Sequence, residues 1–414
     1  MSLSNASALT ARIRAEARRL GFFRTGIARA SEAPHEDHFR TWLHRGFHGD
    51  MRYLERRQAE RLDPRLVLPG ARSVIVAAMA HPAPLPADRG PLRGRIARYA
   101  LGDDYHTVVG DRLARLLAFI QKEVPSARGK GYVDAGPVLE KPWGAPSGLG
   151  WIGKHALLVT REGGSWFHLG VLLVDLELEA DPPAADGCGD CALCVGACPT
   201  GAIVAPRVVD ARRCLSYLTI ELRGSIPRAL RPLLGNRVFG CDACQDACPC
   251  NSAADRAEGL DEGFDLPGLV ALTAEGFAAR FGSTPIERIG RDRLVRNAVV
   301  ALGNSGAAGA AVPLGAALRD RSALVRAHAA WALGRLPCAE GRRLLETARD
   351  REQDPEVFGC VTALCRAAPT FRAGVRCLID YLPVVHAPDC EVLLIEGIHG
   401  LNPRLTESIP LEHK

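Results

Sequence analysis

Nine of the fourteen cysteines lie between residues 188 and 250, and their spacing points to iron–sulfur chemistry. Residues 188–199 read CGDCALCVGACP, the C-x2-C-x2-C-x3-C-P spacing that holds a [4Fe–4S] cluster. Residues 241–249 read CDACQDACP, a second run that is one thiol short. Cys214 lies between the two runs and can supply the missing ligand. Eight thiolates therefore suffice for two clusters.

In runs of this kind the fourth cysteine ligates the other cluster. The predicted ligands of the first cluster are Cys188, Cys191, Cys194 and Cys248. The predicted ligands of the second cluster are Cys198, Cys214, Cys241 and Cys244. The intervening chain must then fold back so that the two clusters lie close together, and two such one-electron centres need a redox partner at each end.

Two other uses of these cysteines are weaker. Paired C-x2-C sequences can bind zinc, but zinc requires neither the three-cysteine spacing nor a proline after each final cysteine. A disulfide framework is typical of short secreted domains, and this chain has 414 residues. The ninth thiol, Cys250, is interpreted as a free cysteine.

The composition is that of an ordinary water-soluble protein with two or three domains. Apolar residues make up 47% and charged residues 24% of the chain, and the net charge is +5. No apolar run approaches the roughly 18 residues of a membrane span. The N-terminal residues contain no apolar signal-peptide core, so we expect a cytoplasmic protein without a membrane partner.

Helices and strands are expected to alternate without a regular βαβ rhythm. The pattern predicts helices over residues 7–20 and 108–124 and an apolar strand over 73–79. Strands over 156–160 and 166–178 are expected to form a hairpin through two consecutive glycines. This mixture favours an α+β fold.

A glycine-rich loop follows at residues 148–154, GLGWIGK. It satisfies both the dinucleotide-binding and the Walker spacing, but both motifs need a preceding strand and a following helix. Here a proline- and glycine-rich loop precedes it and a strand-like segment follows. What remains is a loop in which backbone can approach a ligand closely. Asp104 and His106 nearly match a motif that supplies a histidine ligand to cobalamin, but the glycine arrives one residue late, so His106 is not counted as a cobalt ligand.

The C-terminal third contains internal repeats. Residues 294–303, LVRNAVVALG, are echoed by 324–334, LVRAHAAWALG, and faintly by 356–364. A period of about 30 residues predicts a short HEAT-like helical solenoid. Its arginines are candidates for a phosphate-binding face, although ordinary surface charge explains them equally well; they are Arg291, Arg293, Arg296, Arg319, Arg321, Arg326 and Arg335.

Taken together, these features resemble the epoxyqueuosine reductase family, from about residue 12 to residue 336. The motifs that carry the resemblance, besides the glycine loop, lie at residues 65–74, 98–106, 133–140, 213–221, 239–246 and 328–334. The sequence departs from the family pattern at Ala135, His155 and Cys250.

The resemblance implies a nitroreductase-like cobalamin-binding domain over residues 1–180 and a ferredoxin-like two-cluster domain over 181–255. HEAT-like repeats would follow over 256–370, and residues 371–414 have no assigned role. It also implies reduction of the epoxide of epoxyqueuosine to queuosine at the wobble position of tRNA. Electrons would pass from an external donor through both clusters to base-off cobalamin, and Asp134 would be the proton donor of a monomeric enzyme.

The residues that the resemblance implies for cobalamin binding come from several segments. They are Arg57, Ala97, Arg98, Tyr99, Asp134, Gly148, Gly150, Trp151, Ile152, Gly153, Lys154, His155, Ser216 and Asp242.

The chemistry is consistent with this set of groups. Removing an epoxide oxygen as water takes two electrons and two protons, and clusters deliver electrons singly. A positioned acid must protonate the leaving oxygen. Two alternatives are a cobalamin- and iron–sulfur-dependent dehalogenase acting on a small molecule, and a non-catalytic electron carrier. The carrier leaves Asp134 and the glycine loop unexplained, and the dehalogenase leaves the helical repeats unexplained.

Overall fold

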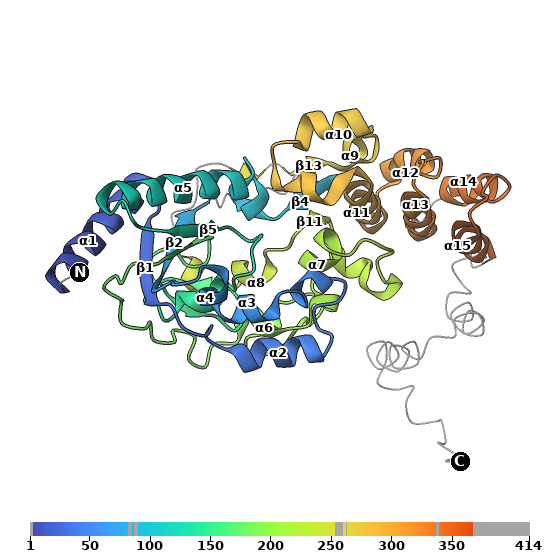
Figure 1. Cartoon of the computed structure of the whole chain (residues 1–414). Helices are drawn as coiled ribbons and strands as arrows, with labels where there is room; N and C mark the ends of the chain where they lie inside the picture. Colours follow the sequence, from blue (N-terminus) through green and yellow to red (C-terminus); the bar gives the residue numbers. More distant parts are fainter. Residues whose placement is uncertain are drawn as a thin grey trace, which may run out of the picture.

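The computed structural model describes residues 3–81, 85–86, 90–252, 260–261, 263–336 and 339–366. A mixed α/β body forms one end of the molecule, and a row of helices forms the other (Figure 1). The predicted C-terminal segment 371–414 lies outside the described residues. None of the described helices is both long and apolar enough to cross a membrane.

A four-stranded antiparallel sheet organises the body, in the order β1 (Arg24–Arg29), β2 (Ser73–Ala80), β8 (Phe167–Val174), β5 (Gly129–Tyr132). One face packs against α1 (Leu3–Arg19) and α5 (Tyr105–Glu123), where Ile75 meets Ile13 and Leu116 in one apolar cluster. On the other face Val74 belongs to a second cluster with Trp143. Because β2 and β8 are buried on both faces, they read as continuous apolar runs.

The predicted strand over 73–79 and the helix over 108–124 are therefore confirmed within a few residues. The predicted hairpin is wrong. The short strand β7 (Leu158–Val159) pairs with β6 (Trp151–Ile152), whereas β8 pairs with β2 and β5. A strand that is apolar on both faces is most stable between two neighbours, and only one isolated bridge, between Thr160 and Gly164, remains of the hairpin.

The cysteine segment belongs to the same body. Its short helices α6 (Leu193–Gly196) and α8 (Ala243–Asp246) each follow or overlap a C-x2-C pair and contact each other. Strand β11 (Arg237–Phe239) pairs in parallel with β4 (Arg93–Ile96) from the N-terminal third. The predicted boundary near residue 181 is thus crossed by strand pairing.

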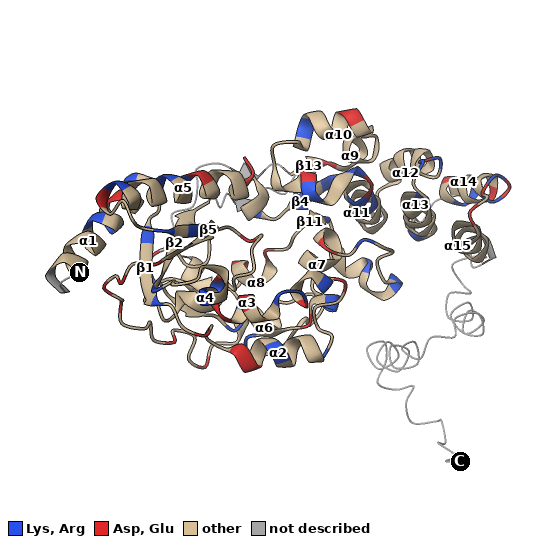
Figure 2. Ribbon diagram, in the orientation of Figure 1, with Lys and Arg blue, Asp and Glu red and all other residues tan. Residues whose placement is uncertain are grey.

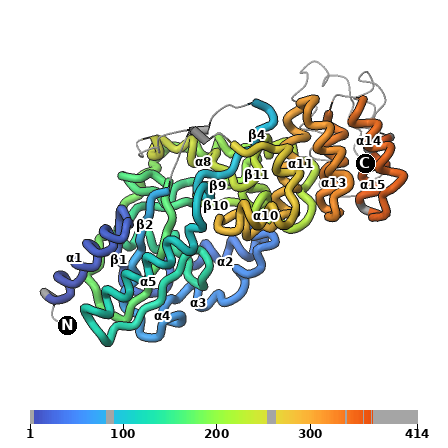
Figure 3. Tube along the Cα trace, turned by 90° about the horizontal axis from the view of Figure 1, so that it is seen from above, coloured from blue at the N-terminus to red at the C-terminus, as the bar shows by residue number. Residues whose placement is uncertain are grey.

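The row of helices begins with α9 (Leu266–Val270) and α10 (Ala274–Phe281). The sequence repeats fall on α11 (Gly290–Ser305), α13 (Ala323–Arg335) and α15 (Pro355–Arg366), which pack one after another. Helices α12 (Ala311–Ala317) and α14 (Ala339–Arg349) alternate with them along the chain, and the row runs away from the sheet (Figure 3). One continuous apolar core joins this row to the cysteine segment.

The remaining α-helices and strands are short. They are α2 (Glu36–His44), α3 (Gln58–Leu62), α4 (Pro64–Val67), α7 (Leu215–Ile220), the pairs β9 (Ile203–Ala205) with β10 (Val208–Val209) and β3 (Leu85–Pro86) with β12 (Leu260–Asp261), and β13 (Phe264–Asp265), which pairs with β4.

Candidate active site

Asp134 stands at the end of β5 in a left-handed backbone conformation, with φ of 53°. Aspartate is one of the few residues that tolerate this region. Its side chain is 66% exposed and accepts a hydrogen bond of 2.7 Å from the Tyr105 hydroxyl. Its backbone N–H donates to Oε1 of Glu140 at 2.5 Å. The carboxyl group is therefore held in place and faces open space.

The space beside Asp134 is a cavity of about 230 Å³. It is enclosed by side chains from β8, α5, α8 and the loops around them. The lining residues are His81, Tyr99, Tyr105, Asp134, Glu140, Lys141, Leu157, Leu158, Ser165, Phe167, His168, Leu169 and Gln245.

A stack of rings forms one wall. Tyr105 lies between His106, with ring centroids 4.1 Å apart, and His168, at 4.3 Å with the ring planes parallel within 1°. Burial, together with the charges of His81 and His106, lowers the pKa of His168 to about 3. Burial and the charge of Asp134 raise the pKa of Tyr105. At neutral pH the wall therefore presents a neutral imidazole and a neutral phenol that donates to Asp134.

The described cysteines form no disulfide, and thiols from both runs lie near one another. Burial raises the pKa of Cys244, and the nearby thiols of Cys241, Cys214 and Cys198 raise it further. Burial raises the pKa of Cys248 to about 11, and the neighbouring Cys250 thiol and, to a smaller extent, Cys194 of the first run raise it further. Thus the last cysteine of each run lies beside thiols of the other run, as the predicted ligand exchange requires.

No single-metal site is preformed among these thiols. Within the described residues, no three His, Cys, Asp or Glu side chains are placed to hold one metal ion. The assignment of clusters therefore depends on the cysteine spacing and on the proximity of the two runs.

The cysteine segment also forms part of the cavity wall. Gln245 lies on α8 between two predicted ligands, and its amide donates to the Ser165 carbonyl at 3.0 Å and to the Ser165 hydroxyl at 3.1 Å. Asn251 accepts from the Ser165 N–H at 2.6 Å. The helix that carries Cys244, a predicted ligand of the second cluster, therefore also lines the cavity.

The residues implied for cobalamin binding are only partly gathered here. Tyr99 and Asp134 line the cavity. Ala97, Arg98 and Asp242 lie at an adjoining seam, where the Arg98 N–H donates to Asp242 at 3.0 Å. The Arg98 guanidinium also contacts Asp246 at 2.5 Å and lies 4.7 Å from the centre of the Trp166 ring. The Arg98 guanidinium therefore links the cysteine segment to the residues that lead into β8.

The glycine loop at 148–154 does not itself line the cavity, and close packing accounts for its glycines. A Cβ on Gly150 would come within 2.0 Å of the Val159 carbonyl oxygen, and one on Gly148 within 2.8 Å of the Pro182 carbonyl oxygen. The glycines are thus required by close packing of the protein's own backbone. Trp151 and Ile152 form β6, and Gly153 and Lys154 begin the turn that connects β6 to β7.

His155 and Trp151 offer polar atoms to a ligand. Their ring nitrogens Nε2 and Nε1 are buried and find no hydrogen-bond partner among the described residues. Because the Leu157 N–H donates to Nδ1 of His155 at 3.2 Å, the neutral ring carries its proton on Nε2. Burial, reinforced by Lys141, lowers the pKa of His155 to about 4, so this ring is neutral at pH 7.

Two of the implied contacts lie elsewhere. The Arg57 side chain is exposed and pairs with Glu60 at 3.0 Å, and Ser216 is half-buried on α7. Neither lines the cavity.

Sequence reasoning missed several of the cavity residues. Tyr105 and Glu140 were inside quoted motifs, which was a usable signal. His81 and His168 carried none, because they meet only through the pairing of β2 with β8, in which His168 faces Met79. Paired one-electron centres beside an acid-lined cavity are the arrangement of an iron–sulfur oxidoreductase.

Comparison with known proteins identifies the family to which this oxidoreductase belongs. A family model described as "Epoxyqueuosine reductase QueG, DUF1730" matches residues 61–135, and one described as "4Fe-4S double cluster binding domain" matches 187–251. The epoxyqueuosine reductase of Xanthomonas campestris is 42% identical over 336 residues, which span 78% of this chain and 95% of the relative. The chain belongs to the epoxyqueuosine reductase family.

Solved structures agree. An epoxyqueuosine reductase crystallised with an epoxyqueuosine-modified tRNA-Tyr stem loop is 30% identical, with a TM-score of 0.81 over 87% of this chain and 98% of that one. An epoxyqueuosine reductase from Bacillus subtilis, with its catalytic loop swung out of the active site, is 28% identical, with a TM-score of 0.80 over 87% of this chain and 98% of that one. The mixed α/β body with its double-cluster segment is thus the fold of this family.

Proposed function

We propose that this oxidoreductase converts the epoxide of epoxyqueuosine in tRNA to the cyclopentene of queuosine. The observation that carries the proposal is Asp134, held by Tyr105 in a cavity whose lining also includes Gln245 from the cysteine segment. An acid and an electron source thus meet at one cavity, in a chain 42% identical to a named epoxyqueuosine reductase.

The seven thiols of the two runs and the thiol of Cys214 would hold two [4Fe–4S] clusters, in accordance with the matched double-cluster model. An external electron donor would reduce these clusters. The free thiol Cys250 is two residues from Cys248 and is not needed as a ligand.

We propose that cobalamin binds in base-off form at this cavity and beyond it. The aromatic wall suits the face of a large ring, and Tyr99 and Asp134 are the implied contacts that line the cavity. The buried N–H groups of His155 and Trp151, which do not line the cavity, find no partner among the described residues and are further candidates to hold the polar edge of the ring. When bound, cobalamin supplies a centre that two single electrons can convert to a nucleophile.

The protein's own part in the reaction is to deliver a proton. Asp134 faces the cavity, and the Tyr105 hydroxyl stabilises the carboxylate that remains after proton transfer. A positioned general acid of this kind typically contributes about 100- to 10,000-fold to the rate.

We propose that the stacked helices α11 to α15 are a HEAT-like array and that this array holds the tRNA. Five of the seven candidate arginines are committed to internal contacts. Arg291 pairs with Asp320, Arg326 with Glu352, Arg293 and Arg296 donate to backbone carbonyls, and Arg335 lies over the Trp331 ring. Basic and acidic residues are interspersed over this end of the molecule (Figure 2). Net charge alone therefore does not mark a binding face.

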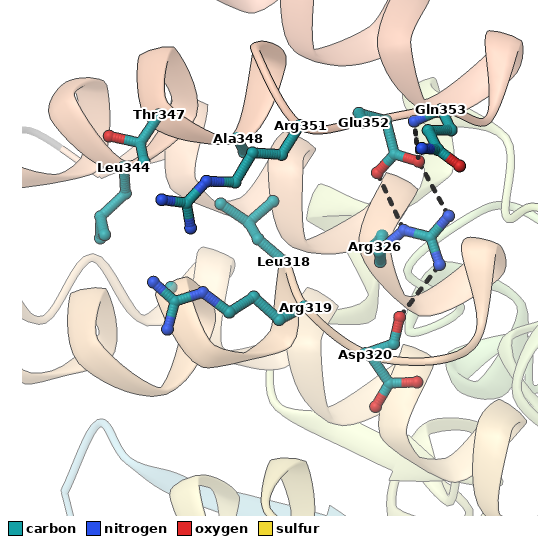
Figure 4. Close-up of a pocket in the computed structure, with 11 residues that line it drawn as sticks. Leu318, Arg319, Asp320, Arg326, Leu344, Thr347, Ala348, Arg351, Glu352 and Gln353 are labelled. Carbon is teal, nitrogen blue, oxygen red and sulfur yellow. Dashed lines mark hydrogen bonds and ion pairs between the residues drawn. The ribbon is translucent and has the colours of Figure 1, made fainter.

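Arg319 and Arg351 differ from these five. Both line a cavity of about 310 Å³ between α12 and α14, and among the described residues neither guanidinium meets an acid. Figure 4 shows the two side chains extending in the same direction, on the far side of the cavity from the Arg326–Glu352 pair. Two unneutralised guanidinium groups in one hollow suit a phosphate of the tRNA backbone.

The division into segments 1–180, 181–255 and 256–370 marks functions rather than separate bodies, because β4–β11 pairing and one apolar core cross the boundaries. We further propose that the enzyme acts as a monomer in the cytoplasm.

The decisive experiment is anaerobic incubation of the cluster-loaded protein with cobalamin, a chemical reductant and tRNA containing epoxyqueuosine. Nucleoside analysis should show conversion to queuosine. Full cluster content without conversion would contradict the proposed function and favour an electron carrier.

A further inference from the structure

The proposed reaction needs more protons than one aspartic acid supplies. Both C–O bonds of the epoxide break, a C=C bond forms, and the oxygen leaves as water. Two electrons from the reductant and two protons balance this change. Asp134 can supply one proton per turnover before it is itself reprotonated, so a second donor at the same cavity is required for direct release of water.

Glu140 has the required position. It lines the same cavity as Asp134, just before the 3-10 helix Lys141–Gly144. Its Oε1 atom accepts the Asp134 backbone N–H at 2.5 Å, and no described residue forms a hydrogen bond with Oε2. One oxygen therefore fixes the loop that carries the first acid, and the other is left for the cavity.

The titratable groups around Glu140 come from four elements. Asp134 belongs to its own loop, Arg61 to α3, Lys141 to the 3-10 helix and Tyr105 to α5. Burial, followed by the charge of Asp134, raises the pKa of Glu140 to about 8, against the opposing effects of the Asp134 N–H, Lys141 and Arg61. Glu140 is thus protonated at neutral pH, and the proton resides on Oε2, because Oε1 accepts a hydrogen bond.

The neighbouring groups are poorer donors. The pKa of His168, about 3, leaves its ring without a proton to release as an acid. The Tyr105 hydroxyl already donates to Asp134, and its pKa is raised. His106 does not line the cavity; its Nδ1 is bound to Asp104 at 2.6 Å, and its Nε2 lies 3.8 Å from Oδ2 of Asp134 rather than beside Glu140.

We infer that Glu140 is a second catalytic acid, which transfers the proton on Oε2 to the departing oxygen after Asp134 has transferred the first. The inference rests on the proposed function, since it assigns the second proton of that reaction. Water then leaves, and both carboxylates are reprotonated from solvent.

The Glu140→Gln variant tests the inference because glutamine keeps an oxygen that can accept the Asp134 N–H but has no acidic proton. We expect turnover of the cobalamin-loaded enzyme to fall at least tenfold with KM for tRNA unchanged. The wild-type rate should decline as pH rises through about 8, the pKa of Glu140, and the variant should lack this decline. The exposed Glu177→Gln change is the matched control. Wild-type rate and pH profile in Glu140→Gln would overturn the inference.

A second measurement does not depend on activity. The infrared difference between wild type and Glu140→Gln, both cluster-loaded, should contain the carbonyl stretch of a protonated carboxyl group at pH 7. That band should disappear with a midpoint near pH 8. A carboxylate spectrum at pH 6 would overturn the inference even if the variant were inactive. Absence of turnover in the wild type, in contrast, would count against the proposed function itself.

Discussion

The cavity beside Asp134 and the row of helices use the same residue types in opposite ways. In the helices, the buried arginines bind carboxylates or backbone carbonyls. Arg296 is fully buried and donates to the carbonyls of Leu218, Leu222 and Gly224. At the cavity, Asp134 is 66% exposed, and Glu140 keeps an oxygen that no described residue engages.

The difference shows where stability and chemistry are located. A polar group that is fully hydrogen-bonded in the interior contributes to folding, and its removal leaves partners unsatisfied. A polar group held on one side and open on the other contributes little to folding and remains available to a substrate. Substitutions at the two regions should therefore separate cleanly into losses of stability and losses of rate.

The largest effect is expected for Asp134→Asn. Turnover should fall by about 100- to 10,000-fold, because the general acid is removed. Asparagine tolerates the left-handed backbone, so the melting temperature and the iron content should not change. Single-turnover nucleoside analysis measures the rate, and the exposed Asp103→Asn change is the control. A rate near that of the wild type would remove Asp134 from the mechanism.

Next in size is Cys214→Ser. If Cys214 completes the second cluster, about half of the iron should be lost, since each cluster needs its four thiolates. Cys250→Ser should retain the full iron content. Iron and sulfide analysis of anaerobically purified protein measures both variants. Loss of iron in Cys250→Ser but not in Cys214→Ser would show that Cys250 is the ligand.

In the helices, Arg296→Met should reduce stability without slowing the reaction. Each buried carbonyl left without its donor costs about 1–3 kcal/mol, so we expect a decrease of about 3 kcal/mol or more in the free energy of unfolding. Denaturant unfolding measures it, with Arg335→Met as the partly exposed control. If turnover at low temperature decreased together with stability, the proposed separation of stability in the helices from chemistry at the cavity would be contradicted.

Glu140 should impose a pH-dependent cost on stability. Its folded pKa of about 8 lies above the ordinary 4.5, so the folded chain binds a proton that the unfolded chain lacks between these values. Stability should therefore decline as pH rises through this interval. Glu140→Gln should melt higher than the wild type at pH 9 and nearly alike at pH 5. Parallel melting curves at both pH values would contradict the raised pKa.

The smallest effect is expected for the paired change Arg319→Gln and Arg351→Gln. Binding of the tRNA should weaken uniformly, and the dependence of log K on log salt should become shallower by about 1 for each phosphate that the variant no longer neutralises. Arg343→Gln on α14, where the guanidinium already pairs with Glu340, is the control. An unchanged salt dependence would show that Arg319 and Arg351 are ordinary surface charges that do not bind the tRNA backbone.

Local patterns were predicted well from the sequence, and the packing of distant segments was not. Each of the features that were predicted well depends on residues within a few dozen positions of one another. These features are the cysteine runs, the strand at 73–79 and the helical repeats. The cavity residues His81, Tyr105, Glu140 and His168 come from separate elements. The ring centroids of the two histidines lie 4.9 Å apart because of the register between β2 and β8. The hairpin prediction was wrong for the same reason, because the partners of β8 are chosen by burial rather than by the adjacent turn.

The clamp between Ser165, Gln245 and Asn251 ties the shape of the cavity to the metal centres. Gln245 lies between two predicted cluster ligands and holds Ser165 through its carbonyl and hydroxyl oxygens, while Asn251 holds the Ser165 N–H. Oxygen that destroys the neighbouring cluster would release α8 and, with it, one wall of the cavity. An air-damaged molecule would then lose its grip on the reacting nucleoside together with its electron supply, so it would not occupy substrate that it could no longer reduce.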